Sequence, residues 1–242
     1  MESYKETVLV KGASGEIGAQ NVRKLMNYRY QFILHYNDND QIIKELINEL
    51  DDDQLLAVIQ ADLSNDKGIK QFIDATAFYV DHIVFAQGIP HYELLIDTES
   101  RTIDQLYHIH VKSTMLISQT FLPSMIHRKK GNIIVVSSIW GEVGASNEVV
   151  YSAMKGAQNA FVKALAKEVG ISGIRVNAIS PGLIDTKMND KLSEEEIDMW
   201  KQQIPLKRIG TVDDVAKVVK FLCSQDSKYI HGQIIRVNGG TI

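Results

Sequence analysis

Short runs of apolar, largely β-branched residues alternate along the whole chain with longer segments that have the spacing of amphipathic helices. The runs predict strands at residues 7–10, 31–35, 55–59, 83–86, 132–136, 174–179 and 233–237. Between them, apolar residues three and four positions apart predict helices at 17–28, 41–50, 67–76, 103–127, 150–169 and 212–222. This alternation is typical of α/β proteins. We expect a single Rossmann-type domain over residues 1–242, a doubly wound parallel sheet of about seven strands with helices on both faces.

The composition limits the partners and the compartment. Of the 242 residues, 45% are hydrophobic, so the chain can bury a substantial core. Lys and Arg number 26 against 30 Asp and Glu, which argues against nucleic acid as the main partner. The only cysteine, Cys223, leaves no intramolecular disulfide. Residues 1–6 are polar, and no later stretch approaches about 18 consecutive apolar residues, so we expect a cytoplasmic protein that does not enter the membrane.

Glycines cluster where the first predicted strand gives way to a helix, in the sequence KGASGEIG at residues 11–18. A tight glycine turn lets the backbone approach a pyrophosphate, and the helix N-terminus adds free N–H groups and a positive dipole end. An ordinary strand-to-helix turn is the alternative interpretation. The position after the first strand of a βαβ unit favours a dinucleotide-binding loop. Its candidate ligands are Gly12, Ser14, Gly15, Ile17 and Gly18.

Ligands of open α/β sheets bind beyond the carboxyl ends of the strands, so the residues that end later strands are further candidates. Asp62 is expected either to accept a hydrogen bond from an adenine amino group or to cap the next helix. Tyr36 stands where an acid would hold the ribose 2′-hydroxyl of NAD, which favours NADP(H) and leaves NAD(H) open because Asp38 is near. The remaining candidates are Asn37, Leu63, Ala86, Gly88, Pro181 and Gly182.

Three residues predict proton transfer at the same sheet edge. Ser138 follows the fifth predicted strand, and Tyr151 and Lys155 lie four positions apart on the next helix, so their side chains share a face. A nearby cation lowers the pKa of a tyrosine from its usual value of about 10 toward neutrality, as a general acid requires. Ser138 is placed to hydrogen-bond the same substrate oxygen.

Together these motifs resemble the short-chain dehydrogenase/reductases, and among them the 3-oxoacyl-acyl carrier protein reductase group, over essentially the whole chain. The resemblance also rests on Pro181-Gly182, YSAMK at 151–155, IPL at 204–206 and VNGG at 237–240. It implies that NAD(P)H gives a hydride to a carbonyl carbon while Tyr151 delivers the proton, Ser138 polarises the carbonyl and Lys155 also binds the nicotinamide ribose. It further implies that Ile184 and Thr186 hold the nicotinamide carboxamide, and that the protein is a homotetramer or a dimer.

The chain departs from the family pattern at four places. Lys11 replaces a threonine, and Glu16 replaces the second glycine of the loop. Residues 86–88 read AQG instead of Asn-Ala-Gly, and His110 stands where the catalytic asparagine is expected. We expect Glu16 to face solvent, away from the pyrophosphate. His110 is expected either to hold the water of the proton relay or to help pack its helix.

The segments at 137–145 and 151–158 resemble a branch of Gram-positive bacterial reductases that includes the elongation factor P 5-aminopentanone reductase. The carbonyl substrate is therefore expected on acyl carrier protein or on elongation factor P. Basic residues at 128–130 supply half of a carrier-docking patch, or simply complement a helix dipole, while Ser172 stands at the second docking position.

Two features between the motifs are candidates for substrate recognition. Glu142 lies between Ser138 and Tyr151 in sequence and is expected to accept a cationic substrate. The alternative is that it is an ordinary loop carboxylate. Trp140 is a second residue expected to contact the substrate. Residues 183–203 fall outside the alternation and are expected to form a lid, or else a solvated surface helix.

The sequence also bears on a non-catalytic function and on metal binding. A non-catalytic dinucleotide-binding sensor or scaffold is the alternative to an enzyme, because a fold does not fix a function. A metal site is not expected, since His108 and His110 are two positions apart and point to different faces of a helix.

Overall fold

A parallel sheet positions every candidate residue. The computed structural model describes residues 5–190 and 192–242. Within them, seven parallel strands pair in the order β3-β2-β1-β4-β5-β6-β7, so the winding direction reverses between β1 and β4. The strands are β1 (Glu6–Lys11), β2 (Tyr30–Tyr36), β3 (Leu55–Gln60), β4 (His82–Phe85), β5 (Gly131–Val136), β6 (Ile174–Pro181) and β7 (Ile234–Val237). The predicted strands and the doubly wound fold are confirmed.

The helices follow the predicted pattern with one local difference. The principal ones are α1 (Glu16–Leu25), α2 (Asp40–Glu49), α3 (Asp66–Ala75), α4 (Ser100–Leu106), α5 (Ser113–Arg128), α7 (Val149–Val169) and α9 (Val212–Cys223). The segment predicted as one helix at 103–127 is interrupted by a π-helical turn, η1 (Tyr107–Lys112). Apolar spacing does not reveal such a turn, because the flanking helices keep their own periodicity.

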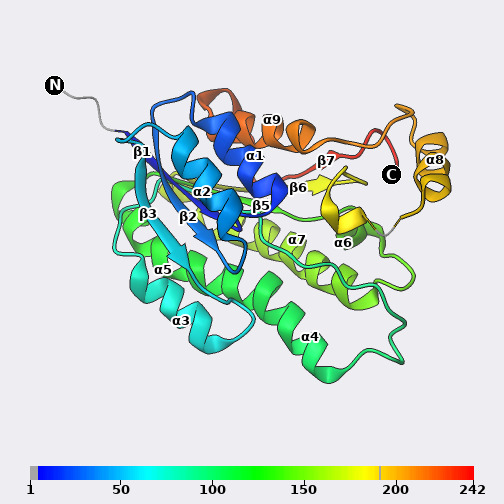
Figure 1. Cartoon of the computed structure of the whole chain (residues 1–242). Helices are drawn as coiled ribbons and strands as arrows, with labels where there is room; N and C mark the ends of the chain where they lie inside the picture. Colours follow the sequence, from blue (N-terminus) through cyan, green and yellow to red (C-terminus); the bar gives the residue numbers. More distant parts are fainter. Residues whose placement is uncertain (1–4, 191) are drawn as a thin grey trace.

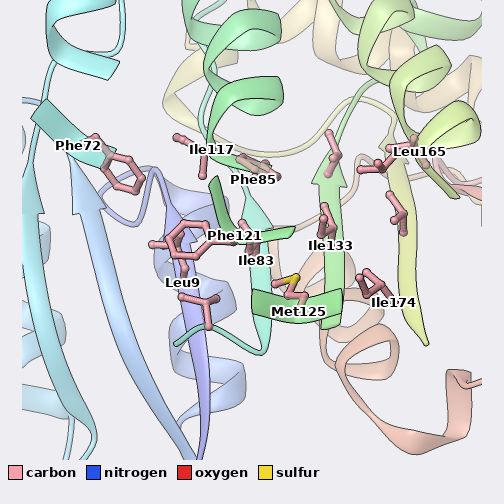
Figure 2. Close-up of a cluster of buried hydrophobic side chains, with 14 of the residues drawn as sticks. Leu9, Phe72, Ile83, Phe85, Ile117, Phe121, Met125, Ile133, Leu165 and Ile174 are labelled. Atoms are coloured by element: carbon pink, nitrogen blue, oxygen red, sulfur yellow. The ribbon is translucent and has the colours of Figure 1, made fainter. Parts of the chain in front are cut away.

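Each face of the sheet carries its own core. Helices α1, α2 and α9 cover one face, and α3, α5 and α7 cover the other (Figure 1). In β1, Leu9 enters the second core, while its neighbours Val8 and Val10 enter the first. Figure 2 shows Leu9, Ile83 and Ile133 of the strands facing Phe72, Phe121 and Met125 of the helices. Burial on both faces explains why the strands are uniformly apolar.

Residues 183–203 contain a short 3-10 turn, η3 (Lys187–Asn189), and helix α8 (Glu194–Gln203); residue 191 lies outside the described residues. Ser193 and Glu196 close a reciprocal capping box at the start of α8, so the acidic run has a local role in helix initiation. The Trp200 ring lies 6.0 Å from the Trp140 ring, between centroids. The segment therefore contacts a predicted substrate residue, and its role as a lid stays a prediction.

Lys11 occupies an unusual place for a lysine. It is fully buried at the end of β1, and its Nζ donates to the Ser113 hydroxyl at 2.5 Å. The same nitrogen lies 5.3 Å from the centroid of the Phe85 ring. Burial lowers the pKa of Lys11 well below its usual 10.5, and the charge of Lys155 lowers it further.

This burial predicts a specific pH dependence of stability. Between the lowered pKa of Lys11 in the folded protein and its usual 10.5, the unfolded chain binds more protons, so the free energy of unfolding rises with pH. Lys11→Met should remove this part of the rise between about pH 7 and pH 10. Urea unfolding at several pH values measures it, with exposed Lys167→Met as the control. Identical slopes for Lys11→Met and the wild type would contradict the prediction.

Candidate active site

The glycine loop after β1 is held by a buried histidine that the sequence reasoning did not single out. The Gly12 N–H donates to Nδ1 of His35 at 3.2 Å, and Nε2 of His35 donates to the Ala61 carbonyl at 3.0 Å. Burial lowers the pKa of His35 to about 3, so the ring is neutral and can accept at Nδ1. Gly12 has a φ of +80°, and a Cβ there would lie 2.7 Å from the Cα of Gln87. His35 thus ties together the carboxyl ends of β1, β2 and β3.

The predicted cofactor residues all lie at the carboxyl edge of the sheet, on both sides of the switch between β1 and β4. Five lie in the glycine loop and the first turn of α1: Gly12, Ser14, Gly15, Ile17 and Gly18. Tyr151 and Lys155, also predicted to bind the cofactor, lie in the first two turns of α7. The others end or follow their strands: Tyr36 and Asn37 at β2, Asp62 and Leu63 at β3, Ala86 and Gly88 at β4, and Pro181, Gly182, Ile184 and Thr186 at β6. Folding therefore gathers them along one edge of the sheet.

Asp62 does not cap α3. The N-cap is Asn65, whose side chain accepts from the Gly68 N–H at 2.9 Å. Asp62 instead accepts from the Ser64 N–H at 2.9 Å and from the Ser64 hydroxyl at 2.8 Å. The capping alternative for Asp62 is wrong, and its adenine contact stays a prediction.

Ser138, Tyr151 and Lys155 meet as the sequence predicted. All three side chains are buried where β5 ends and α7 begins, and Tyr151 is hydrogen-bonded to Ser138. The Lys155 Nζ lies 5.6 Å from the centroid of the Tyr151 ring and donates to the Val136 carbonyl at 2.9 Å. A hydroxyl, a phenol and an amine thus converge on one point.

The pKa values in this trio differ from the sequence expectation. Burial raises the pKa of Tyr151, the Glu148 carboxylate raises it further, and the Ser138 hydrogen bond lowers it. Burial lowers the pKa of Lys155 to about 7. The predicted fall in the pKa of Tyr151 beside Lys155 is contradicted, because burial disfavours both charged forms and the Lys155 amine hydrogen-bonds to the Val136 carbonyl.

His110 lies against the trio. It is fully buried in η1, and its ring is 5.6 Å from the Tyr151 ring between centroids. Nε2 lies 3.1 Å from the Ile89 carbonyl, while Nδ1 lacks a hydrogen-bond partner among the described residues. A Cβ at Gly88 would lie 2.8 Å from the His110 Cε1 and 3.7 Å from the Lys155 Nζ. Glycine at position 88 is therefore what allows His110 to approach the end of β4 so closely, whereas Lys155 would be in ordinary contact with a Cβ there.

Three departures from the family pattern form one buried cluster around η1. The π-helical turn leaves the Ile109 carbonyl to accept from Ser113 Oγ at 2.6 Å and from Gln87 Nε2 at 3.2 Å. Lys11 donates in turn to Ser113. Lys11 and Gln87 thus contact the turn that carries His110 through Ser113 and the Ile109 carbonyl.

Comparisons with known proteins agree with this geometry. A family model described as enoyl-(acyl carrier protein) reductase matches residues 12–241. The chain is 41% identical over 239 residues to an uncharacterized oxidoreductase, YmfI, of Bacillus subtilis, covering 97% of this chain and 98% of that protein. It is 34% identical over 237 residues to the 3-oxoacyl-[acyl-carrier-protein] reductase FabG of Rickettsia prowazekii, covering 98% and 97%. The chain belongs to the short-chain dehydrogenase/reductase family.

Solved structures share the short-chain dehydrogenase/reductase fold. A blue fluorescent protein from a metagenomic library, in complex with NADPH, is 28% identical with a TM-score of 0.89, covering 98% of this chain and 97% of that one. A putative gluconate dehydrogenase from Agrobacterium tumefaciens is 27% identical with a TM-score of 0.89, covering 98% and 95%. As a member of this family, the chain is an oxidoreductase.

Glu142 has partners within the short-chain dehydrogenase/reductase domain itself. It lies in the short helix α6 (Trp140–Val143) and accepts from the Ser180 hydroxyl at 2.7 Å. Its other carboxylate oxygen accepts two hydrogen bonds from Arg236, at 2.9 and 3.0 Å. Both oxygens are engaged, so the geometry favours the alternative of a structural loop carboxylate over contact with a cationic substrate.

Glu148 is the acid that lies beside the phenol, and the sequence reasoning missed it. It is the N-cap residue of α7, one turn before Tyr151, and its carboxylate is half-buried. Asn147 precedes it with a φ of +63°, and its Nδ2 donates to the Tyr92 hydroxyl at 2.9 Å. The Glu93 N–H donates to the Asn147 carbonyl at 2.7 Å. An acid three positions before the tyrosine was the available signal, because such residues share a helix face.

Two other classes of site find no support in the described part of the chain. Across residues 5–190 and 192–242, no group of three His, Cys, Asp or Glu side chains is arranged to hold a metal ion. No helix in the same ranges has the length and apolarity to cross a membrane. A cavity of about 520 Å³ lies at the opposite, amino edge of the sheet, lined among others by Gly131 and Ile174, the first residues of β5 and β6.

The Glu148 carboxylate predicts a shift in the pH profile of this short-chain dehydrogenase/reductase. Glu148→Gln keeps the size and removes the charge that raises the pKa of Tyr151. The phenol then ionises at lower pH, so the alkaline limb of kcat/KM for ketone reduction should move down by roughly half a unit or more. Glu93→Gln, in the neighbouring loop, is the matched control. An alkaline limb that stays in place or moves to higher pH would refute the assignment.

Proposed function

We propose that this chain reduces a ketone to a secondary alcohol, with hydride from NADPH and a proton from Tyr151. The observation that carries the proposal is the convergence of Ser138, Tyr151 and Lys155 at the same sheet edge as the glycine loop. The geometry fits a dinucleotide, because the left-handed turn at Gly12 and the open first turn of α1 leave N–H groups for a diphosphate.

The positions of the residues at the sheet edge indicate which part of the dinucleotide each of them would hold. The first turn of α1, with Ser14 and Ile17, would hold the diphosphate; Asp62 and Leu63 would hold the adenine. Ile184 and Thr186 would hold the carboxamide, and Lys155 the nicotinamide ribose. When bound, the dinucleotide supplies the hydride. Tyr36, in place of an acid, supports NADP(H) over NAD(H), as does the NADPH complex of the similar metagenomic protein.

The protein's own residues manage the proton. The Ser138 and Tyr151 hydroxyls donate hydrogen bonds to the carbonyl oxygen and polarise it. As negative charge develops on that oxygen, the O–H bond of Tyr151 breaks and the proton forms the alcohol. The Lys155 ammonium stabilises the resulting phenolate. Nδ1 of His110 holds the water through which Tyr151 and Lys155 regain a proton, since it is buried, neutral and without a protein partner among the described residues. The net change consumes one ketone, one NADPH and one proton.

Tyr151→Phe tests the chemistry directly. The variant keeps the ring and its packing but loses the proton donor, so ketone reduction should fall by roughly a hundredfold or more while NADPH binding stays unchanged. NADPH oxidation with a small ketone and NADPH fluorescence titration measure the two effects. Tight NADPH binding by the wild type without turnover of any ketone would instead favour a non-catalytic sensor or scaffold.

The ketone is proposed to be carried on acyl carrier protein, as the names of the FabG relatives indicate for those proteins. The apolar side chains of Val143, Val149, Met188 and Met199 are exposed on α6, α7, η3 and α8, where an acyl chain can lie against them. We propose the homo-oligomer typical of the family for this chain.

A second candidate substrate is the 5-aminopentanone group of elongation factor P. Two observations favour it. Arg128 and Lys130 of the expected carrier-docking patch are engaged with Asp81, and Lys130 also with Glu6. Glu148, meanwhile, places a negative charge beside Tyr151, where a substrate ammonium would be stabilised.

A paired assay separates the candidates. Acetoacetyl thioester, an enoyl thioester and aminopentanone-bearing elongation factor P are each offered with NADPH and with NADH. Reduction of the acetoacetyl thioester at least tenfold faster than the others supports the carrier-linked substrate, and the reverse order supports the elongation factor. We expect the enoyl thioester to be inert, and Glu142→Gln to change the two ketone rates equally because its carboxylate is engaged with Ser180 and Arg236. Preferential reduction of the enoyl thioester would overturn ketone reduction.

A further inference from the structure

The glycine loop and the predicted lid are joined by one hydrogen bond. Oε2 of Glu16, in the first turn of α1, accepts from the backbone N–H of Lys187 at 2.6 Å, across 171 positions of sequence. Glu16 is partly exposed, and its carboxylate also has a partner within the protein. The residue that replaces a family glycine reaches out of the loop and holds another segment.

The segment that Glu16 holds has a second attachment of its own. Near Ile184, the Gly210 N–H donates to the Leu183 carbonyl at 2.9 Å, and the Asp185 N–H donates to the Gly210 carbonyl at 2.9 Å. From Lys187 onward, the bonds of η3 are internal: Asn189 donates to the Thr186 carbonyl and Leu192 to the Asn189 carbonyl. Thr186 thus lies between an anchor at Gly210 and an anchor at Glu16.

The negative charge of Glu16 also affects the binding of a dinucleotide. A carboxylate in the first turn of α1 is stabilised by the positive end of the helix dipole. A dinucleotide diphosphate is expected to use the same helix end. The protein's own carboxylate therefore lies close to where a second anion would bind, and like charges there oppose each other.

We propose that Glu16 is a positioning residue that fixes Thr186 and the start of the lid through the Lys187 N–H before any dinucleotide binds. The same carboxylate weakens the binding of the diphosphate. The protein therefore binds the cofactor less tightly than it would without this charge, but the start of its lid is already in position. The inference rests on the glycine loop as the dinucleotide site and is independent of which ketone is reduced.

Two substitutions separate the hydrogen bond from the charge. Glu16→Gln keeps an acceptor for the Lys187 N–H and removes the charge, so the lid should stay fixed and NADPH should bind more tightly, by roughly threefold or more. Glu16→Ala removes both, so the Lys187 amide should exchange with solvent roughly tenfold faster. The gain in NADPH affinity should then be largely lost, because the binding partners are no longer preorganised.

Hydrogen–deuterium exchange of the free full-length protein measures the first effect, in the peptide that spans Lys187. NADPH fluorescence titration measures the second. A third readout is the KM for the ketone, which should rise in Glu16→Ala with little change in kcat and return toward the wild-type value in Glu16→Gln. Glu168→Gln, an equal charge change at an exposed position near the end of α7, is the matched control and should leave all three readouts unchanged.

Each possible result either supports or overturns the proposed role of Glu16. Fast exchange in Glu16→Ala alone, with tighter NADPH binding in Glu16→Gln, supports the proposal. Unchanged exchange at Lys187 in Glu16→Ala, or weaker NADPH binding in Glu16→Gln, overturns it. Because exchange is measured on the free protein, a failure of ketone reduction would not imitate either result.

Discussion

The structure depends on the burial of one parallel sheet on both of its faces. Leu9 and Val10, adjacent in β1, enter different cores, so this central strand is fixed in register by two helical layers at once. Parallel strands share a carboxyl edge, and the order of this sheet reverses between β1 and β4. The arrangement of the strand ends at that reversal is therefore a product of core packing, and hydrogen bonds such as those of His35 to Gly12 and Ala61 then tie neighbouring ends together.

The free-energy cost of forming the site lies mainly in the burial of its polar groups. Lys11, His110 and Lys155 are all buried, and burial lowers the pKa of each. Such groups persist in an interior only where partners satisfy most of their hydrogen bonds. The turn η1 supplies part of this need, because its carbonyls accept from Ser113 and Gln87. The π-helical turn and the buried polar side chains around it thus satisfy part of one another's hydrogen bonding.

The sequence predicted what depends on periodicity and on fixed spacing. Strands, helices and the meeting of Ser138 with Tyr151 and Lys155 follow from patterns that repeat along the chain or recur on one helix face. The π-helical turn at 107–112 could not be predicted, because the hydrogen bonds at and beside it come from side chains of β1 and of the loop after β4, which are distant in sequence. The pKa of Tyr151 was misjudged for a related reason, since spacing gives neighbours but not the degree of burial.

The three acids near the site show where sequence reasoning ends. Glu142 lies between the catalytic candidates in sequence, yet its carboxylate pairs with Arg236 of β7. Glu16 was expected in solvent, and its partly exposed carboxylate also accepts a hydrogen bond from the Lys187 N–H, 171 positions away. Glu148, which was not singled out, is the acid that acts on Tyr151. A carboxylate on a loop takes the partner that tertiary folding brings within a few ångströms, and sequence distance carries little information about that partner.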